Sequence, residues 1–194
     1  MEQKNKPFPN EDHLLWKEVS VKQIADCRIF KVTESLRENA RGKQVKMAVV
    51  DAPDWVCIIP VVKKDGEDHC IMVRQFRQGS KTITQEFPAG TNDPGEEPLH
   101  AATRELLEET GVTAGKMTLI GHINPNPAFM NNNQYFYLAE DLQFSGTQDL
   151  DEDEVIDYYL VPLQEVKQKM GQAPFNNGTM MSALIFLLRY RGEI

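Results

Sequence analysis

The feature that most constrains this chain is a polar loop leading into a short helix that ends in three glutamates. The pattern predicts a helix from Pro98 to Thr110, because proline suits the first helical turn and Gly111 is a natural C-terminal cap. Side chains follow one another at about 100° around a helix, so the glutamates gather on one exposed face and aliphatic residues on the other. The aliphatic face must be buried against the rest of the protein.

The three glutamates, Glu105, Glu108 and Glu109, lie where negative charge is doubly unfavourable. They repel one another, and the C-terminal end of the helix dipole disfavours them as well. Such a cluster of hard oxygens is what Mg²⁺ or Mn²⁺ prefers, with water and substrate phosphate completing the coordination. Arg104 can pair with one carboxylate and hold it in place. Taken alone, the three glutamates would equally fit a solvated acidic face.

Strand and helix patterns alternate over the rest of the chain. The apolar runs at 55–62 and 69–74 suit burial on both faces, so we expect them to be central strands. The class is α/β, with helices covering a mixed sheet. Further strand patterns occupy 83–87, 117–123, 134–139 and 155–161, and helical patterns occupy 163–170 and 179–190.

The N-terminal part has a different character. Residues 1–18 form a polar lead-in, and 19–52 form an antiparallel β segment with strands at 28–33 and 45–50. Strands of this number make a poor core by themselves, so the segment packs on the main body or on a second subunit. We place the main domain at 53–194.

The net charge and the cysteines indicate which binding partners to expect and in which cellular compartment the protein works. The net charge of −8 repels phosphate backbones and no basic run is visible, so we expect no nucleic-acid partner. No stretch has the length of apolar sequence that a membrane span needs, so we expect no membrane association. Cys27, Cys57 and Cys70 lie in apolar runs, which favours buried free thiols and a cytoplasmic location. A divalent metal would still let this acidic protein bind an anionic small molecule.

The complete spacing from Gly90 to Val112 resembles the signature box of the Nudix hydrolase family. It follows G-x5-E-x7-R-E-U-x-E-E-x-G-U, with U an aliphatic residue, and every fixed position is filled. The resemblance implies a Nudix α/β/α sandwich and hydrolysis of a nucleoside diphosphate linked to another moiety. It also implies that Glu105, Glu108 and Glu109 hold Mg²⁺, or Mn²⁺, as the cofactor.

The flanking sequence resembles the ADP-ribose and nucleotide-sugar pyrophosphatase branch of that family. Val73-Arg-Gln-Phe-Arg77 and Gln85-Glu-Phe-Pro-Ala-Gly90 look like its Q-[YF]-R and E-[FL]-P-A-G elements. By this resemblance Arg77 contacts the pyrophosphate and the Ala89 carbonyl binds metal, and both groups suit those roles chemically. Taken alone, Arg77 would be a surface arginine.

The acidic run from Asp151 to Glu154 is similar to the D-E-x-E element of the branch. The resemblance makes Glu152 the general base and Glu154 a further metal contact, with Glu105 as the other catalytic carboxylate. Taken alone, a run of acids would be a solvated loop.

Two further segments bear on substrate recognition and assembly. In relatives the N-terminal strands exchange across a homodimer and stack a side chain on the base, which implies a homodimer with Arg28 and Phe30 as substrate-binding residues. Either could equally be an ordinary strand residue. The loop from Pro127 to Asn133 departs from the branch, where Pro-Gly and an acidic residue are common. Its asparagines could bind sugar hydroxyls or form a plain polar turn.

These features predict metal-dependent hydrolysis of a small-molecule nucleoside diphosphate sugar. The first expectation is ADP-ribose, cleaved to AMP and ribose 5-phosphate by in-line attack of an activated water. The alternatives are another NDP-sugar such as GDP-mannose, or a non-catalytic Nudix sensor. Sensors typically lose box glutamates, whereas this box is complete.

Overall fold

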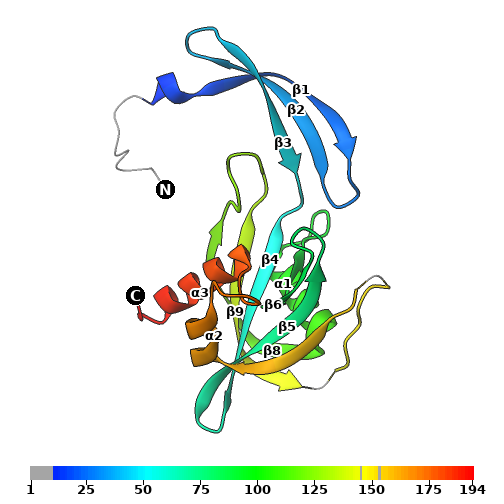
Figure 1. Ribbon diagram of the computed structural model, residues 1–194, viewed down its shortest axis with the longest axis vertical. Helices are drawn as coiled ribbons and strands as arrows, with labels where there is room; N and C mark the ends of the chain where they lie inside the picture. The colour runs from blue at the N-terminus through cyan, green and yellow to red at the C-terminus, as the bar shows by residue number, and fades with distance from the viewer. Residues whose placement is uncertain (1–10, 145, 153) are drawn as a thin grey trace. The chain divides into compact units, whose positions relative to one another are not determined.

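The computed structural model describes residues 11–144, 146–152 and 154–194, which divide into two units (Figure 1). The first unit comprises the chain up to residue 52 together with 126–131, and the second comprises 53–125 and 132–194. Residues 1–10 of the expected lead-in, and Asp153 of the acidic run, lie outside the described residues.

The first unit is an antiparallel meander. Its middle strand β2 pairs with β1 on one side and with β3 on the other. β1 begins at Trp16, inside the stretch expected to be a polar lead-in, because charged residues along this exposed strand hide its pattern. The elements are η1 (Asp12–Leu14), β1 (Trp16–Asp26), β2 (Lys31–Asn39) and β3 (Gln44–Asp51).

Arg28 and Phe30 lie in the turn between β1 and β2, although the sequence pattern placed them on a strand. Arg28 has a φ of 67°, and its backbone N–H donates to Asp26 Oδ1 at 3.2 Å. A short aspartate side chain that binds a nearby backbone N–H favours a turn over strand pairing. Strand β2 therefore starts later than predicted.

The second unit is built on a mixed sheet. The order of its strands is β10-β5-β4-β9-β8, with β6 paired to β5 and β7 paired to β4. β4 and β9 run parallel, and the other pairs are antiparallel. The predicted central strands are β4 and β5. The strands are β4 (Trp55–Lys64), β5 (Glu67–Arg77), β6 (Thr82–Glu86), β7 (Ala89–Thr91), β8 (Val112–Ile123), β9 (Gln134–Phe144) and β10 (Asp157–Pro162).

Helices cover both faces of this sheet. Side chains of β4 point alternately to the two faces, so they belong to two different hydrophobic cores. Val56 and Ile58 pack with α1 on one face, and Cys57 and Ile59 pack with α2 and α3 on the other. This confirms the α/β/α sandwich with a mixed sheet (Figure 1). In the described part of the chain no helix is long and apolar enough to cross a membrane. The helices are α1 (Pro98–Thr110), α2 (Leu163–Lys169) and α3 (Gly178–Tyr190).

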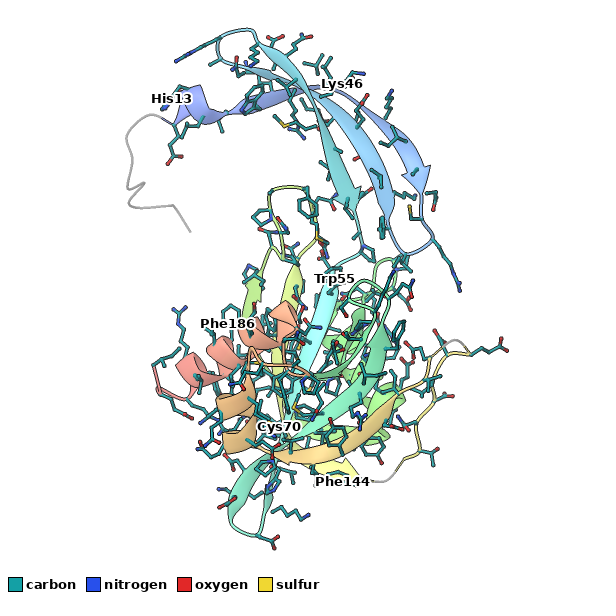
Figure 2. The ribbon with its side chains drawn as sticks, in the orientation of Figure 1. His13, Lys46, Trp55, Cys70, Phe144 and Phe186 are labelled. Carbon is teal, nitrogen blue, oxygen red and sulfur yellow. The ribbon has the colours of Figure 1, made fainter. Side chains whose placement is uncertain are left out.

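The cysteines follow this division between the units. Cys57 and Cys70 are buried free thiols in the second unit, as predicted, and Figure 2 labels Cys70. Burial raises the pKa of both, to about 12 for Cys70, so they stay protonated and unreactive. Cys27 is exposed, contrary to the prediction, because it lies next to the β1–β2 turn rather than in a core strand.

Candidate active site

The helix α1 has the bounds that the sequence predicts, but its faces differ from the prediction. Gly111 caps it with a φ of 66°, and its N–H donates to the carbonyl of Leu107 at 2.7 Å. Leu99 and Leu107, expected on the buried face, are 42% and 40% exposed. Glu109, expected to be exposed, is only 3% exposed.

Glu109 is buried because strand β7 passes beside the end of α1. The N–H of Ala89 donates to Glu109 Oε2 at 3.1 Å, which gives the buried carboxylate one partner. Burial raises the pKa of Glu109 well above its ordinary value, and the charge of Glu105 raises it further. Helical periodicity shows which residues share a face, but not that a distant strand covers it.

Glu105 lies against the backbone of the same strand. A Cβ atom on Gly90 would lie 2.1 Å from the carboxyl carbon of Glu105, so only glycine leaves room for this side chain. Burial raises the pKa of Glu105 to about 7, although Arg104 opposes the rise. The end of α1 therefore holds two carboxyl groups whose ionised form is disfavoured by burial.

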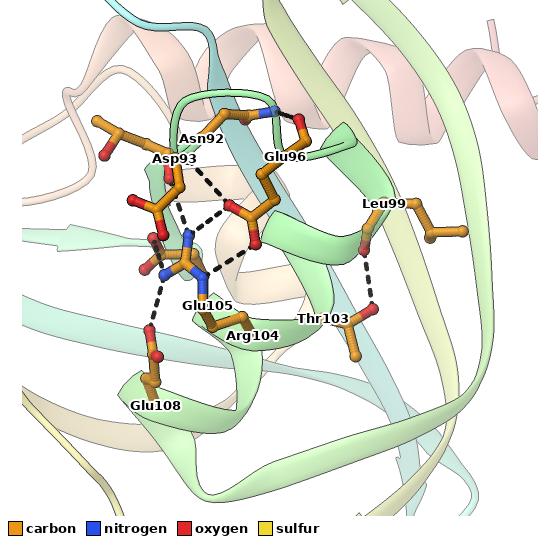
Figure 3. A network of polar contacts seen from close by, with 9 residues as sticks. Asn92, Asp93, Glu96, Leu99, Thr103, Arg104, Glu105 and Glu108 are labelled. Carbon is orange, nitrogen blue, oxygen red and sulfur yellow. Dashed lines mark hydrogen bonds and ion pairs between the residues drawn. The ribbon is translucent and has the colours of Figure 1, made fainter.

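Arg104 ties together the remaining carboxylates (Figure 3). Its Nη1 donates to Glu105 Oε1 and to Glu108 Oε2, both at 2.9 Å. Its Nε and Nη2 pair with the two carboxylate oxygens of Glu96 at 3.1 and 3.0 Å. The ion pairs of Arg104 with Glu105 and Glu108 agree with the sequence prediction, and Glu96 of the preceding loop joins the same network.

The donor chemistry at this helix end suits a hard divalent cation. Glu105, Glu108 and Glu109 are oxygen donors on one helical turn, and the buried pair gains most from a cation. Within the described residues, no three acidic, histidine or cysteine side chains are grouped so that they could hold a metal ion. In this arrangement Arg104 forms ion pairs with Glu105 and Glu108, whereas Glu109 is bonded to the N–H of Ala89.

The raised pKa of Glu105 predicts a pH dependence of stability in metal-free protein. Because its pKa is about 7 in the folded state and 4.5 by ordinary values, the folded state binds the proton more tightly. The free energy of unfolding should therefore fall as pH rises from 4.5 to 7, by on the order of 3 kcal/mol from this group. Denaturant unfolding with a chelator present should show that the free energy of unfolding falls less steeply with pH in Glu105→Gln than in the wild type. Parallel pH profiles for the two proteins would contradict the prediction.

Arg77 is held by a buried carboxylate on the neighbouring strand. Its Nε and Nη2 donate to the two oxygens of Glu86 at 3.0 and 2.6 Å, and Thr84 Oγ1 also donates to Glu86. Burial alone would raise the pKa of Glu86, but the pairing with Arg77 lowers it. The guanidinium stays partly exposed and lies within electrostatic range of Glu109 at the end of α1 and of Glu154 in the loop before β10.

Replacing Arg77 by alanine is expected to raise KM about tenfold or more, with a smaller effect on kcat, because a charge-assisted contact to the substrate is lost. Steady-state kinetics below the unfolding temperature of the variant would measure this. Arg74→Ala is the matched control, since Arg74 is an exposed arginine on the same strand. An unchanged KM in folded Arg77→Ala protein would remove Arg77 from the substrate site.

The loop after β9 brings acidic residues to the end of α1. The N–H of Gly146 donates to Gly111 O at 3.0 Å, and that of Asp149 donates to Glu108 O at 2.9 Å. The charge of Glu154 raises the pKa of both Glu105 and Glu109, so Glu154 lies within electrostatic range of them. Glu152 is exposed on the same loop, and its role as general base stays a prediction.

The asparagine loop has structural partners of its own. Asn131 Oδ1 accepts the N–H of Ala52 at 3.3 Å, and its Nδ2 donates to Asp51 Oδ1 at 2.8 Å, within the first unit. The N–H of Asn133 donates to Asp54 Oδ1 at 2.7 Å, within the second unit. These contacts favour the polar-turn interpretation over sugar binding. Arg28 and Phe30 belong to the first unit, and their binding roles stay predictions.

Two residues with a place in this network were missed by sequence reasoning. Glu86 is the glutamate of the E-[FL]-P-A-G element, and its position on a short strand after the strand that carries Arg77 could have suggested the pair. Gln148, which bonds to the carbonyl of Glu109, carried no signal, because its partner is distant in the sequence.

Carboxylates on one helical turn, with a partly exposed arginine within electrostatic range of Glu109, are groups that metal-assisted hydrolysis of phosphate compounds uses. The family follows from comparison with known proteins. A family model described as the NUDIX domain matches residues 53–182, and the chain belongs to the Nudix family.

Individual relatives define the branch. The chain is 35% identical over 150 residues to the ADP-ribose pyrophosphatase of Bacillus subtilis (strain 168), covering 77% of this chain and 80% of the relative. It is 31% identical over 174 residues to the ADP compounds hydrolase NudE of Escherichia coli (strain K12), covering 88% and 90%. The crystal structure of an ADP compounds hydrolase matches with a TM-score of 0.79 and 26% identity over 92% of this chain and 97% of that one. The protein is thus a Nudix hydrolase of the ADP-ribose pyrophosphatase branch.

Proposed function

We propose that this hydrolase cleaves the pyrophosphate bond of ADP-ribose with Mg²⁺ as its cofactor. Water adds across the bond, so one phosphoryl group leaves on AMP and the other on ribose 5-phosphate. The observation that carries the proposal is the pair of carboxyl groups at the end of α1, Glu105 beside Gly90 and the buried Glu109 bonded to the N–H of Ala89, with Arg77 within electrostatic range of Glu109. The names of the relatives support ADP-linked substrates.

In this proposal different residues bind the metal, bind the substrate and accept the proton. Glu105, Glu108 and Glu109, with Glu154 and the Ala89 carbonyl, would hold the metal ions. Bound there, Mg²⁺ would neutralise the pyrophosphate and lower the pKa of the attacking water. Arg77, aligned by Glu86, donates to a phosphate oxygen. Glu152 takes the proton of the attacking water.

A substrate panel tests this proposal. Purified protein is incubated with ADP-ribose, GDP-mannose or UDP-glucose, with Mg²⁺ or with chelator, and the products are separated by chromatography. We expect AMP and ribose 5-phosphate, formed only with the metal and faster than products from the other substrates. Faster cleavage of GDP-mannose would select the alternative NDP-sugar. Binding without turnover of any of these compounds would overturn the proposal.

We also propose that the protein is a homodimer that uses its first unit as an interface. Among residues 11–51 only Ser35 is buried, and Val19, Val21 and Ile24 of β1 are about half exposed. A three-stranded meander that buries so few of its own side chains gains stability when its exposed apolar side chains are buried against a second copy of the chain. Light scattering should give twice the chain mass of 22.1 kDa, and a mass of one chain would overturn this proposal.

We further propose that the enzyme works in the cytoplasm on this small molecule, without nucleic acid or membrane as partner. The buried thiols of Cys57 and Cys70 suit a reducing compartment, and the net charge of −8 disfavours nucleic acid. Fractionation of cells that produce the protein tests the location.

A further inference from the structure

The loop that carries the acidic run is attached to the catalytic helix by hydrogen bonds rather than by apolar packing. The last carbonyl groups of a helix lack partners within the helix. Here the carbonyl of Glu108 accepts the N–H of Asp149 at 2.9 Å, and the carbonyl of Glu109 accepts Nε2 of Gln148 at 2.7 Å. The end of α1 is thus the support on which this loop is built.

Gln148 makes a second bond that closes the loop. The same Nε2 donates to the carbonyl of Ile156 at 3.0 Å, immediately before β10. Its two N–H groups therefore join the helix that carries Glu109 to the far end of the acidic run. The segment 149–156, which contains the acidic run, is thus hydrogen-bonded near the end of α1 at both of its own ends, through Asp149 and through Ile156.

The acidic side chains of this loop and those at the end of α1 carry charges of the same sign, which acts against holding the loop beside the helix. Glu152 and Glu154 are exposed acids, and Glu154 lies within electrostatic range of Glu105 and Glu109. Like charges at this range repel one another. Val155 is 85% exposed, so in the described part of the run Ile156 supplies the buried apolar side chain. Arg77 attracts Glu154 in turn, so these charges act on the loop in both directions, and the two hydrogen bonds of Gln148 supply a contact that does not depend on them.

We propose that Gln148 is a positioning residue, which clamps the acidic loop to the C-terminal turn of α1 and so places Glu152 and Glu154 for the reaction. The neutral amide suits this role. It offers two N–H donors from one atom without adding a charge that would pair with the carboxylates intended for metal. A glutamate at this position would have no donor and would add to the repulsion. The inference rests on the proposed hydrolysis, but the clamp itself can be measured without it.

Hydrogen exchange tests the clamp independently of activity. Gln148→Met keeps the length of the side chain and removes its donors, and Gln143→Met makes the same change at an exposed position of β9. In Gln148→Met we expect the amides of 149–156 to exchange about tenfold faster, with α1 and the sheet unchanged, because two hydrogen bonds are lost. Gln143→Met should match the wild type. Unchanged exchange in this loop would overturn the inference, whatever the activity of the protein.

Kinetics then test the effect on the reaction. With ADP-ribose and saturating Mg²⁺, Gln148→Met should lower kcat about 10- to 100-fold and change KM less than twofold, since misplaced catalytic groups slow the chemical step. Adding Gln148→Met to Glu154→Gln should cost little more, because both changes act through the same loop. Wild-type kcat in Gln148→Met, or independent effects in the double variant, would overturn the positioning role. A wild-type protein without activity on any substrate would instead overturn the proposed function.

Discussion

Replacing Glu109 by glutamine should lower kcat by roughly 100- to 1,000-fold while leaving the fold at least as stable as in the wild type. The two effects have one cause. Glu109 is 3% exposed, and burial raises its pKa, so the charged carboxylate costs folding energy in the absence of metal. Glutamine keeps the shape and can still accept the N–H of Ala89, but it gives up the negative charge that a divalent cation needs.

The measurement compares kcat and the thermal unfolding midpoint in chelator. Glu97→Gln is the control, because it makes the same change at the exposed N-terminal end of the same helix. We expect Glu97→Gln to keep wild-type kcat. A Glu109→Gln protein with full turnover would remove the carboxylate from the reaction, and one that unfolds far below the wild type would show that its charge supports the fold.

The contrast between α1 and β1 shows what the sequence reveals of the fold. The bounds of α1 are predictable because local chemistry sets them: Pro98 opens the helix and Gly111 closes it in the left-handed conformation. The central strands are predictable because both faces are apolar. β1 is not, because its residues are almost all exposed, so neither burial nor alternation marks it.

The grouping of the candidate acids on α1 was predictable from the sequence, but their burial was not. The spacing of Glu105, Glu108 and Glu109 follows from the helix, and so does the i,i+4 ion pair of Arg104 with Glu108. The burial of Glu109 depends instead on β7, whose contact with α1 no local pattern encodes. The same holds for Gln148, whose partner carbonyl belongs to a residue far away in the sequence. Long-range contacts therefore decide which of the similar acids are buried, and with that their pKa values.

A substitution at Gly90 should change the activity strongly while changing the stability of the fold little. In Gly90→Ala the new Cβ would lie 2.1 Å from the carboxyl carbon of Glu105 and within 2.3 Å of both its oxygens, so something must move. The carboxyl group is the far end of a flexible side chain, so it can rotate away at small cost in folding energy. The displaced Glu105 would then no longer lie beside Glu109 and the strand that carries Ala89.

We therefore expect Gly90→Ala to unfold within a few degrees of the wild type but to lose about 100-fold in kcat, since the carboxylate that we propose as a metal ligand is displaced. Gly79→Ala is the matched control, because a Cβ at Gly79 meets nothing within 4 Å, and it should keep full activity. Metal affinity gives a second measurement: manganese binding, followed by electron paramagnetic resonance, should weaken in Gly90→Ala and not in Gly79→Ala. If Gly90→Ala binds manganese and turns over substrate like the wild type, then Glu105 does its work from some other position, and the close contact between strand β7 and helix α1 has no part in catalysis.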